Sequence, residues 1–571
     1  MEWKVKNFFL SLIFNQAFCL FAEKQEPQLD LQNESIGIIH QDISNQEKQN
    51  SPNEKVWTDH LKGIVFYDTP DTKLEDFCML EGVQLKMNVI DEQKFIDAMS
   101  RFLQQPFSAE TIQDLKREVI HFYQKRGFPI IGVFVPAGQD IACGTVSVLI
   151  LVGKLGSVHA EGARYFSNEK IASKLRIKPG EIIQSAPINQ DLVWINQNLF
   201  RSTSLIYEPG NALGETNITL VTKDRVPIRV YGGFENTGNP LTKTPRFLGG
   251  INLGNVFGQE HQLNYLFISE TQPKIWYAHV GSYAIPLPWR DIFKVYGSYT
   301  HTRPSSDAGV NMSGKGWQIC GRYSIPLTIS SWDSEFFVGY EFKRTNNFLS
   351  FGVQSVFNNF IDISQFALGY EGKLNDQRST TSFGIIVYLS PGNMTAFNKT
   401  SCFQTERAGA KSSYYYGKIH VDEILELPHR FSWVMNGVFQ LANGKLLPSE
   451  EFPLGGYYTV RGYEEYEVIS ESGLLLKNEL RFPSIHISGK DKKHELQFLG
   501  FVDFGLSLID DPHVVENHAT ILASAGPALR YNFNDHVLIR IDYGGQLSSV
   551  NNIATHSHRH SRLHVGAQIA F

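Results

Sequence analysis

Two short stretches near the end of the chain decide the fold. Val460-Arg461-Gly462-Tyr463 lies in a glycine-rich loop, and Phe501-Val502-Asp503-Phe504-Gly505 lies in a strand that alternates apolar and polar residues. The chain then ends on another alternating strand, whose last residue is Phe571. A loop arginine, an acid on one face of a strand and a C-terminal aromatic together favour a membrane β-barrel with a loop folded back into its lumen.

The pattern around these stretches extends from about residue 226 to the end of the chain. Segments of roughly 10 residues alternate in character and are separated by turns, as in a transmembrane barrel. In one segment Phe336, Val338, Tyr340 and Phe342 share a face, opposite Gly339, Glu341 and Lys343. Charged side chains are costly in lipid, so that second face must meet a wet interior, and an open sheet edge is not tolerated there. A strand with its loop takes roughly 20–22 residues, so residues 226–571 predict about sixteen antiparallel strands.

Composition supports the barrel over the alternatives. The 571 residues include 47 Gly, 40 Phe and 23 Tyr, which suits many strands, tight turns and aromatic girdles. Mean hydropathy is −0.20, and no run after residue 22 approaches the ~18 apolar residues of a spanning helix. A soluble β-sandwich or propeller would also alternate, but it requires neither an export signal nor a terminal Phe. The net charge of −6 gives no reason to expect a nucleic-acid partner.

The N-terminus is typical of an export signal. Lys4 and Lys6 precede a short apolar stretch, Phe8–Ala22, so residues 1–22 are expected to form a cleaved signal peptide rather than an anchor. Residues 23–60 are polar and indicate a linker. Within them, residues 29–44 contain several isoleucines and could form a short helix.

Two small α/β units follow the linker, at residues 61–152 and 153–225. Each predicts the order β-α-α-β-β, so the architecture is duplicated although the sequence is not. The clearest helix begins after Ser108, a good N-cap, and carries one apolar stripe. Cys78 and Cys143 fall in the first unit, where they either pair in an oxidising compartment or remain as free or buried thiols.

Longer motifs carry a family resemblance. Leu447-Pro448-Ser449-Glu450-Glu451-Phe452-Pro453-Leu454-Gly455-Gly456, running into Val460-Arg461-Gly462-Tyr463, resembles the sixth extracellular loop of two-partner secretion transporters. These are the TpsB proteins, the ShlB/FhaC/HecB haemolysin activators, within the superfamily that includes BamA. Phe501–Gly505 is similar to the second barrel motif of the family, Asn478–Pro483 to the strand after the loop and Tyr283–Leu287 to an early barrel strand. The two α/β units resemble POTRA domains.

The physics of the loop motif points the same way. Arg461 offers five donors in a planar fork, and Asp503, on the expected lumen face, can accept two of them. Gly462 permits a tight turn or a close approach to the wall, and Tyr463 can pack on the wall while its hydroxyl stays in water. Val460, Phe501 and Gly505 flank this pair, and Glu479 and Arg481 point into the lumen by parity and could extend it or compete with it. The alternative is an external loop with a solvated arginine.

The resemblance implies an outer-membrane location with periplasmic POTRA domains and an external arginine loop. It also implies a partner, an unfolded secreted exoprotein that the POTRA domains bind and the barrel passes to the cell surface. Further expected partners are outer-membrane lipid and the barrel-assembly machinery, which would recognise Phe571 as a C-terminal signal. No catalytic constellation, Walker motif or metal-ligand spacing is apparent, so we expect no enzyme, cofactor, metal, nucleotide or nucleic acid. The alternative within the superfamily is an assembly factor of the BamA or TamA kind; a plain porin would need neither the POTRA pair nor the Arg461 loop.

Overall fold

The protein is described from a computed structural model. It covers residues 57–70, 80–137, 139, 141–239, 242–303, 310–329, 332–351, 354–487, 494–510, 517–534, 536–549 and 560–571. The expected signal peptide, the possible helix at 29–44 and Cys78 lie outside these described residues. The chain divides after Arg225 into two compact units, an α/β unit and a β-barrel, and each is described by itself.

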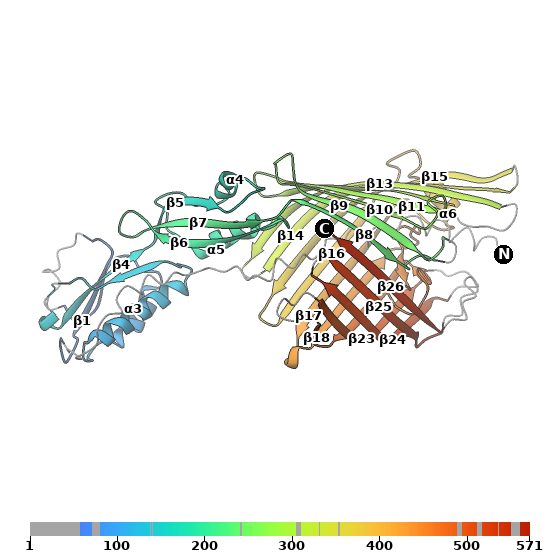
Figure 1. Ribbon diagram of the computed structural model, residues 1–571. Helices are drawn as coiled ribbons and strands as arrows, with labels where there is room; N and C mark the ends of the chain where they lie inside the picture. The colour runs from blue at the N-terminus through green and yellow to red at the C-terminus, as the bar shows by residue number, and fades with distance from the viewer. Residues whose placement is uncertain are drawn as a thin grey trace. The chain divides into compact units, whose positions relative to one another are not determined.

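Among its described residues, the first α/β region has one four-stranded sheet and two α-helices, which Figure 1 shows packed together. Its elements are β1 (Gly63–Tyr67), β2 (Gly82–Lys86), α2 (Glu92–Ser100), α3 (Ala109–Gln124), β3 (Ile131–Phe134) and β4 (Thr145–Val152). The sheet order is β2-β1-β4-β3, with β1 parallel to both neighbours and β3 antiparallel to β4. Ser108 caps α3 by accepting the Thr111 N–H, as predicted. Strand β2 was not predicted, because five residues on a sheet edge carry little periodicity. Cys143 is disulfide-bonded.

The second α/β region repeats the arrangement with fewer strands. Its elements are β5 (Lys154–Glu161), α4 (Asn168–Ala172), α5 (Ser185–Ile195), β6 (Arg201–Pro209) and β7 (Glu215–Asp224). The sheet order is β5-β7-β6, parallel and then antiparallel. Helices α4 and α5 are the two helices expected in this unit from the predicted order β-α-α-β-β. Both regions are therefore consistent with POTRA domains.

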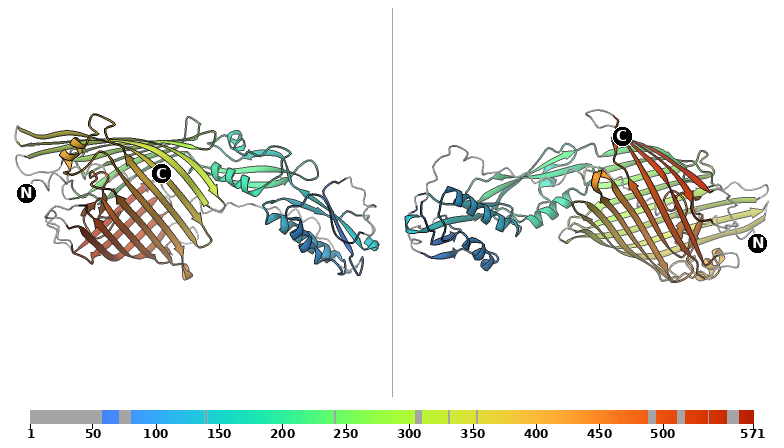
Figure 2. Two further views of the ribbon diagram at one scale, coloured as in Figure 1. Left: turned by 180° about the vertical axis from the view of Figure 1, so that it is seen from behind. Right: turned by 90° about the horizontal axis from the view of Figure 1, so that it is seen from below.

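The remaining chain forms a closed antiparallel barrel (Figures 1 and 2). Its strands are β8 (Ile228–Glu235), β9 (Arg246–Val256), β10 (His261–Ser269), β11 (Trp276–Pro286), β12 (Ile292–Thr302), β13 (Val310–Ile329), β14 (Trp332–Phe351), β15 (Gln354–Asn375), β16 (Ser379–Ser390), β17 (Tyr414–Glu426), β18 (Ser432–Ala442), β21 (Ser472–Arg481), β22 (Ile485–His486), β23 (His494–Leu508), β24 (Ala519–Phe533), β25 (Val537–Gln546) and β26 (Ser561–Ala570). Strands β21 and β22 both pair with β23 and together make one crossing, so the wall has sixteen crossings, as predicted.

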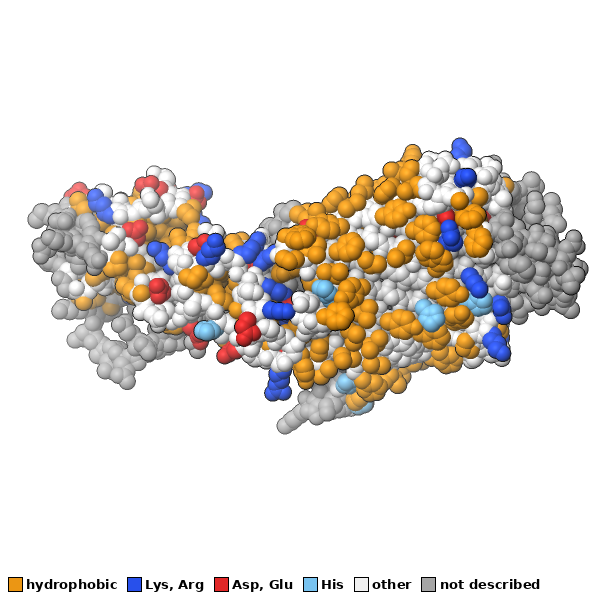
Figure 3. Space-filling model, turned by 90° about the horizontal axis from the view of Figure 1, so that it is seen from above, with side chains coloured by type: hydrophobic (Ala, Val, Ile, Leu, Met, Phe, Trp, Pro, Cys, Tyr) orange, Lys and Arg blue, Asp and Glu red, His pale blue; other side chains and the backbone are white. Residues whose placement is uncertain are grey.

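Side chains alternate across the barrel wall with period 2. Phe336, Val338 and Tyr340 are exposed on the outside, whereas Glu341 and Lys343 are buried inside. The outer face is accordingly a broad apolar surface (Figure 3). No helix among the described residues is long and apolar enough to cross a membrane. The polar inner face and apolar outer face are those of a barrel surrounded by lipid.

The barrel closes between its first and last strands. Strand β26 pairs antiparallel with β8 from Gly566↔Glu235 to Ala570↔Tyr231. Phe571 continues this seam, because its N–H and carbonyl oxygen both bond the backbone of Val230 at 2.8 and 3.0 Å. The Phe571 side chain itself is exposed on the outside. The C-terminus and the start of the barrel therefore lie at one end of the cylinder, which we call the turn end; the opposite end is the loop end.

Candidate functional site: a loop docked inside the barrel

The segment between β18 and β21, residues 443–471, folds back into the barrel from the loop end. Within this segment β19 (Phe452–Leu454) pairs antiparallel with β20 (Val468–Ser470), so the two form a short hairpin below the tip. At its tip Val460, Arg461 and Tyr463 are at most 1% exposed. We call residues 443–471 the docked loop. Burial of the whole tip means that the arginine is held by protein groups rather than by bulk water.

Arg461 joins the docked loop to three strands of the wall. Its Nε and Nη2 donate to Oδ2 and Oδ1 of Asp503 on β23 at 2.7 and 2.8 Å, and its backbone N–H donates to Oδ2 at 3.1 Å. Its Nη1 donates to Glu479 Oε1 on β21 at 2.8 Å and to Asp542 Oδ1 on β25 at 3.0 Å. The guanidinium also lies 3.6 Å from the centre of the Phe501 ring. Such bidentate, charge-assisted bonds fix both the position and the orientation of the loop.

Two further arginines balance the charge of this cluster. Arg530 on β24 donates from both Nη atoms to the Asp542 carboxylate at 2.8 Å, and Arg481 donates to Glu479 Oε2 at 2.8 and 3.0 Å. Three guanidinium groups thus meet three carboxylates. Buried charges are tolerated only when they are paired and hydrogen-bonded, so each side chain of the cluster depends on the others.

Glycines let the loop backbone touch the wall. Gly462 has φ +92°, and a Cβ there would lie 2.9–3.3 Å from the backbone of Gly544 on β25. A Cβ on Gly544 would lie 2.5 Å from the Gly462 nitrogen. A Cβ on Gly505 would meet the side chains of Leu454 and Val460 at 2.8–2.9 Å. A side chain at any of these three positions would push the loop away from the wall.

Tyr463 is more enclosed than the sequence suggested. Its ring is buried, and its hydroxyl lies 2.9 Å from the Ala523 carbonyl oxygen and 2.7 Å from that of Ser548. The expectation of a water-exposed hydroxyl was wrong, because the residues that follow β25 cover it. Tyr463 therefore attaches the docked loop to the barrel wall close to the loop end.

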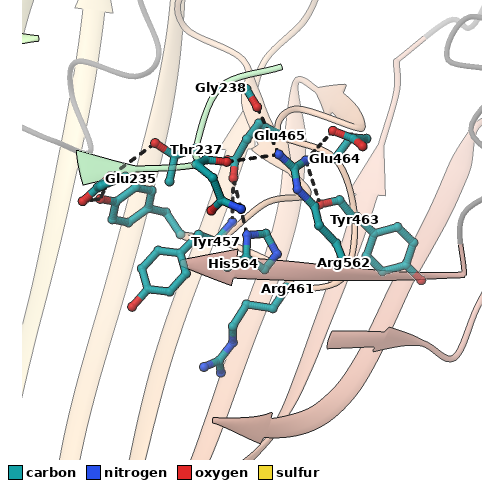
Figure 4. A network of polar contacts seen from close by, with 12 residues as sticks. Glu235, Thr237, Gly238, Tyr457, Arg461, Tyr463, Glu464, Glu465, Arg562 and His564 are labelled. Carbon is teal, nitrogen blue, oxygen red and sulfur yellow. Dashed lines mark hydrogen bonds and ion pairs between the residues drawn. The ribbon is translucent and has the colours of Figure 1, made fainter. Parts of the chain in front are cut away.

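The docked loop also reaches the seam between β8 and β26 (Figure 4). The Tyr458 hydroxyl lies 3.0 and 3.2 Å from the two carboxylate oxygens of Glu235, the last residue of β8. Arg540 donates to Glu235 Oε1 at 2.6 Å. On β26, Arg562 bonds the Glu464 carboxylate of the loop and donates to the Gly238 carbonyl oxygen at 3.0 Å. The loop thus contacts both strands that close the barrel.

A buried acid lies behind the tip. The Tyr457 N–H donates to Glu465 Oε1 at 2.9 Å, and His564 Nδ1 lies 4.0 Å from the same oxygen (Figure 4). The Gly462 N–H donates to His564 Nε2 at 3.2 Å, so the imidazole is a neutral acceptor on that side. Burial raises the pKa of the Glu465 carboxyl to about 7, against the opposing effect of Arg562.

A second attachment holds the root of the loop at a different part of the wall. Lys343 Nζ of β14 donates to both Glu450 carboxylate oxygens at 2.9 and 3.2 Å, and Tyr416 and Gln365 donate to Oε2 at 2.7 and 2.9 Å. Arg407, which follows helix α6 (Thr400–Glu406), bonds both Glu451 and Glu471. The docked loop is therefore fixed at two regions of the lumen rather than at its tip alone.

The structure brings together most of the residues singled out from the sequence. Arg461, Val460, Gly462 and Tyr463 meet Asp503, Phe501, Gly505 and Glu479 at one place, whereas Arg481 contacts Glu479 and not Arg461. Phe571 lies apart from this place, on the seam. Sequence reasoning missed Asp542, His564 and Lys343 as partners of the loop, and Arg530 as the cation that pairs with Asp542. Their inward parity was readable, but the register that brings them to the loop was not.

Comparisons with known proteins identify the family. Residues 214–529, more than half of the chain, match the model of the haemolysin secretion/activation proteins ShlB/FhaC/HecB. The chain belongs to this family. The heme/hemopexin transporter protein HuxB of Haemophilus influenzae is 22% identical over 398 residues, covering 69% of each chain. Outer membrane transporter CdiB-2 of Burkholderia pseudomallei is 24% identical over 63% of this chain and 62% of that protein.

Solved structures give the same fold. CdiB from Escherichia coli superimposes with a TM-score of 0.71 at 15% identity, over 100% of this chain and 98% of that one. BamA from Haemophilus ducreyi, lacking POTRA domains 1–3, gives 0.50 at 13% identity, over 89% of this chain and 99% of that one. The protein is accordingly an outer-membrane transporter that secretes a partner exoprotein, rather than a barrel-assembly factor. The α/β unit is periplasmic, as expected for the family, so the turn end faces the periplasm and the loop end faces outward.

Proposed function

We propose that the docked loop is the gate of this transporter, and that the Arg461 cluster is the attachment that keeps the gate closed. The observation that carries the proposal is the side-on pairing of Arg461 with Asp503, with Glu479 and Asp542 completing the shell around a guanidinium that is 1% exposed. A loop of this length has a large conformational entropy when free, so it stays inside only if specific contacts oppose that entropy.

The chemistry of the cluster suits a reversible gate. The six charged groups of the cluster become well hydrated if the loop leaves, so for them release exchanges protein partners for water. The loop also packs Leu454, Val460 and Tyr463 against Leu475 and Leu522 of the wall, and this apolar contact adds to the attachment. An exoprotein segment that enters the lumen would compete with the loop for space and for the same wall carboxylates. We infer that entry of this segment, rather than an energy source in the periplasm, displaces the loop.

We propose residues 1–22 as the signal peptide, 23–60 as a linker, 61–152 and 153–225 as two POTRA domains, and 226–571 as the barrel. The POTRA domains bind the unfolded exoprotein, with the open sheet edges at β5 and β6 able to accept an added strand. Outer-membrane lipid and the barrel-assembly machinery are further partners, the latter through the C-terminal Phe571. We propose no catalytic activity, cofactor, nucleotide or nucleic acid; folding of the exoprotein outside the cell gives transport its direction.

Secretion of the partner tests the proposal. Deleting the gene removes one large exoprotein from the culture medium and leaves the other outer-membrane barrels in place; loss of many barrels would instead support an assembly function. Arg461→Ala abolishes secretion while the barrel remains inserted in the membrane, because a loop that cannot dock on the wall lies loose in the lumen, in the path of the exoprotein. The matched control is Arg322→Ala, which removes another lumen arginine, paired with Glu335 and Glu371 and not with the loop. Equal secretion by Arg461→Ala and wild type would contradict the gate.

A further inference from the structure

The outer wall of the barrel is not uniformly apolar. Near the loop end, strands β11, β12 and β13 place Tyr277, His279, Tyr299, His301 and Lys315 on one continuous face. The strand register sets Tyr277 opposite His301, His279 opposite Tyr299, and His301 opposite Lys315. This face points outward, because Trp317 and Ile319, which share its parity on β13, are 38% and 52% exposed.

The rings of this face form a connected set. Tyr277 lies 5.3 Å from the His301 ring and 6.2 Å from the Tyr299 ring, between ring centres. The Tyr265 hydroxyl of β10 is 2.7 Å from His279 Nδ1. Tyrosines are ordinary in the aromatic girdle of a barrel. A hydrocarbon surface has no need of histidines. His279 is partly exposed and offers a hydrogen bond to a polar headgroup, whereas His301 is only 7% exposed and packs against the Tyr277 ring.

Three cations border the same face. Lys315 is exposed on β13, Arg303 is exposed directly after β12, and Lys274 is exposed in the turn before β11. The Arg303 N–H donates to the Ile275 carbonyl oxygen at 2.6 Å, which holds Arg303 beside Lys274. Within the part of the chain that the structure describes, none of the three forms an ion pair. We call Lys274, Arg303 and Lys315, with the rings of Tyr277, His279, Tyr299 and His301, the basic patch.

The rest of the wall provides the contrast. At the same end, within three residues of the strand termini, the outward side chains of β16, β18, β24 and β26 are Leu389, Leu441, Ile521 and Leu563, each 48–59% exposed. The cations and histidines of β11, β12 and β13 are therefore a local feature of these strands. They do not belong to a ring of lysines that surrounds the whole barrel at this depth.

We propose that the basic patch is a binding site for a phosphorylated glycolipid of the outer leaflet. The loop end faces outward, so these cations lie at the headgroup depth of that leaflet. Clustered basic residues beside a membrane-spanning wall attract anionic headgroups. Phosphate groups fit the two lysines and the arginine, and sugar hydroxyls fit the imidazole and phenol groups, which both donate and accept hydrogen bonds. This site is separate from the lumen and does not depend on the gate.

Lipid binding to the purified full-length protein tests the site. The probe is diphosphoryl lipid A, titrated into the detergent-solubilised transporter and counted by native mass spectrometry, alongside dephosphorylated lipid A and phosphatidylglycerol. The double variant Arg303→Gln/Lys315→Gln should weaken diphosphoryl lipid A binding by about 25-fold, at about fivefold per cation. The matched control Lys399→Gln/Lys411→Gln removes the same charge from exposed positions of the loop between β16 and β17, and should bind as wild type does.

A charge-preserving variant and the two other lipids complete the test of the basic patch. The charge-preserving variant Arg303→Lys/Lys315→Arg should retain binding, which separates lost charge from a folding defect. Phosphatidylglycerol and dephosphorylated lipid A should bind at least tenfold more weakly than the diphosphoryl form. The proposal is overturned if Arg303→Gln/Lys315→Gln binds diphosphoryl lipid A as tightly as wild type, or if phosphatidylglycerol binds equally well, since that would mean a non-selective anionic surface.

Discussion

Replacing Asp503 by asparagine tests the attachment of the docked loop with the smallest possible change of shape. Asp503 accepts three bonds from Arg461, two of them from the guanidinium. The introduced amide would keep one acceptor oxygen and lose the negative charge. Its NH₂ group would face an N–H donor of Arg461, which it cannot bond. Breaking a buried ion pair costs ~3–5 kcal/mol. Because Glu479 and Asp542 remain at 2.8 and 3.0 Å, we expect the lower value, ~3 kcal/mol.

The fraction of molecules whose docked loop has left the lumen should therefore rise about 100-fold, since 1.4 kcal/mol is a factor of ten in an equilibrium constant. A cysteine reports this release: Thr459 is 5% exposed beside the tip, and Thr459→Cys should react with a membrane-impermeant maleimide only when the loop leaves the lumen. The measurement uses a Cys402→Ser background, because Cys402 is partly exposed. We expect labelling of Asp503→Asn to be about 100-fold faster than that of the parent.

The control is Glu371→Gln, which removes a lumen carboxylate paired with Arg322 at 2.8 Å and distant in the barrel register from the tip. Its labelling rate should match the parent. If Asp503→Asn and Glu371→Gln both label at the parental rate in a folded barrel, then the Asp503 carboxylate does not hold the loop, and the reasoning from buried charge fails.

Three further predictions concern the same loop. Gly462→Ala should reduce secretion at least tenfold, because its φ of +92° and the contact with the wall exclude a side chain; Gly444→Ala, which meets nothing within 4 Å, should leave secretion unchanged. The docked state should be strongest at acidic pH and weaken as pH rises from 4.5 to about 7, because burial raises the pKa of Glu465 and the docked loop therefore holds its proton more tightly. Glu465→Gln should remove this dependence in labelling rates normalised to an exposed reference cysteine. Lys343→Met leaves Glu450 buried without its cation, so the loop root should loosen by ~3 kcal/mol, measured as faster proteolysis of the loop.

The alternation of side chains was readable from the sequence because it is local. A strand has a period of two residues whatever its neighbours are, so Val502 and Asp503 had to face opposite sides of the wall. The same logic gave the strand number, since each crossing of the membrane needs a fixed length. Helix α3 was predicted for an equally local reason, its cap at Ser108. The arginine and its partner came from motif spacing and resemblance rather than from periodicity.

Only the tertiary structure decided which inward-facing residues lie at the same depth inside the barrel. Lys343 and Glu450 are 107 residues apart, and Arg461 and Asp542 are 81 apart, yet each pair is in contact. Such meetings depend on how neighbouring strands are shifted against each other around a closed cylinder, and the shift is fixed by pairing over the whole ring. The sequence by itself therefore determined which side chains face the lipid and which face the lumen. The strand register of the closed barrel determined which six charged groups meet at the loop tip.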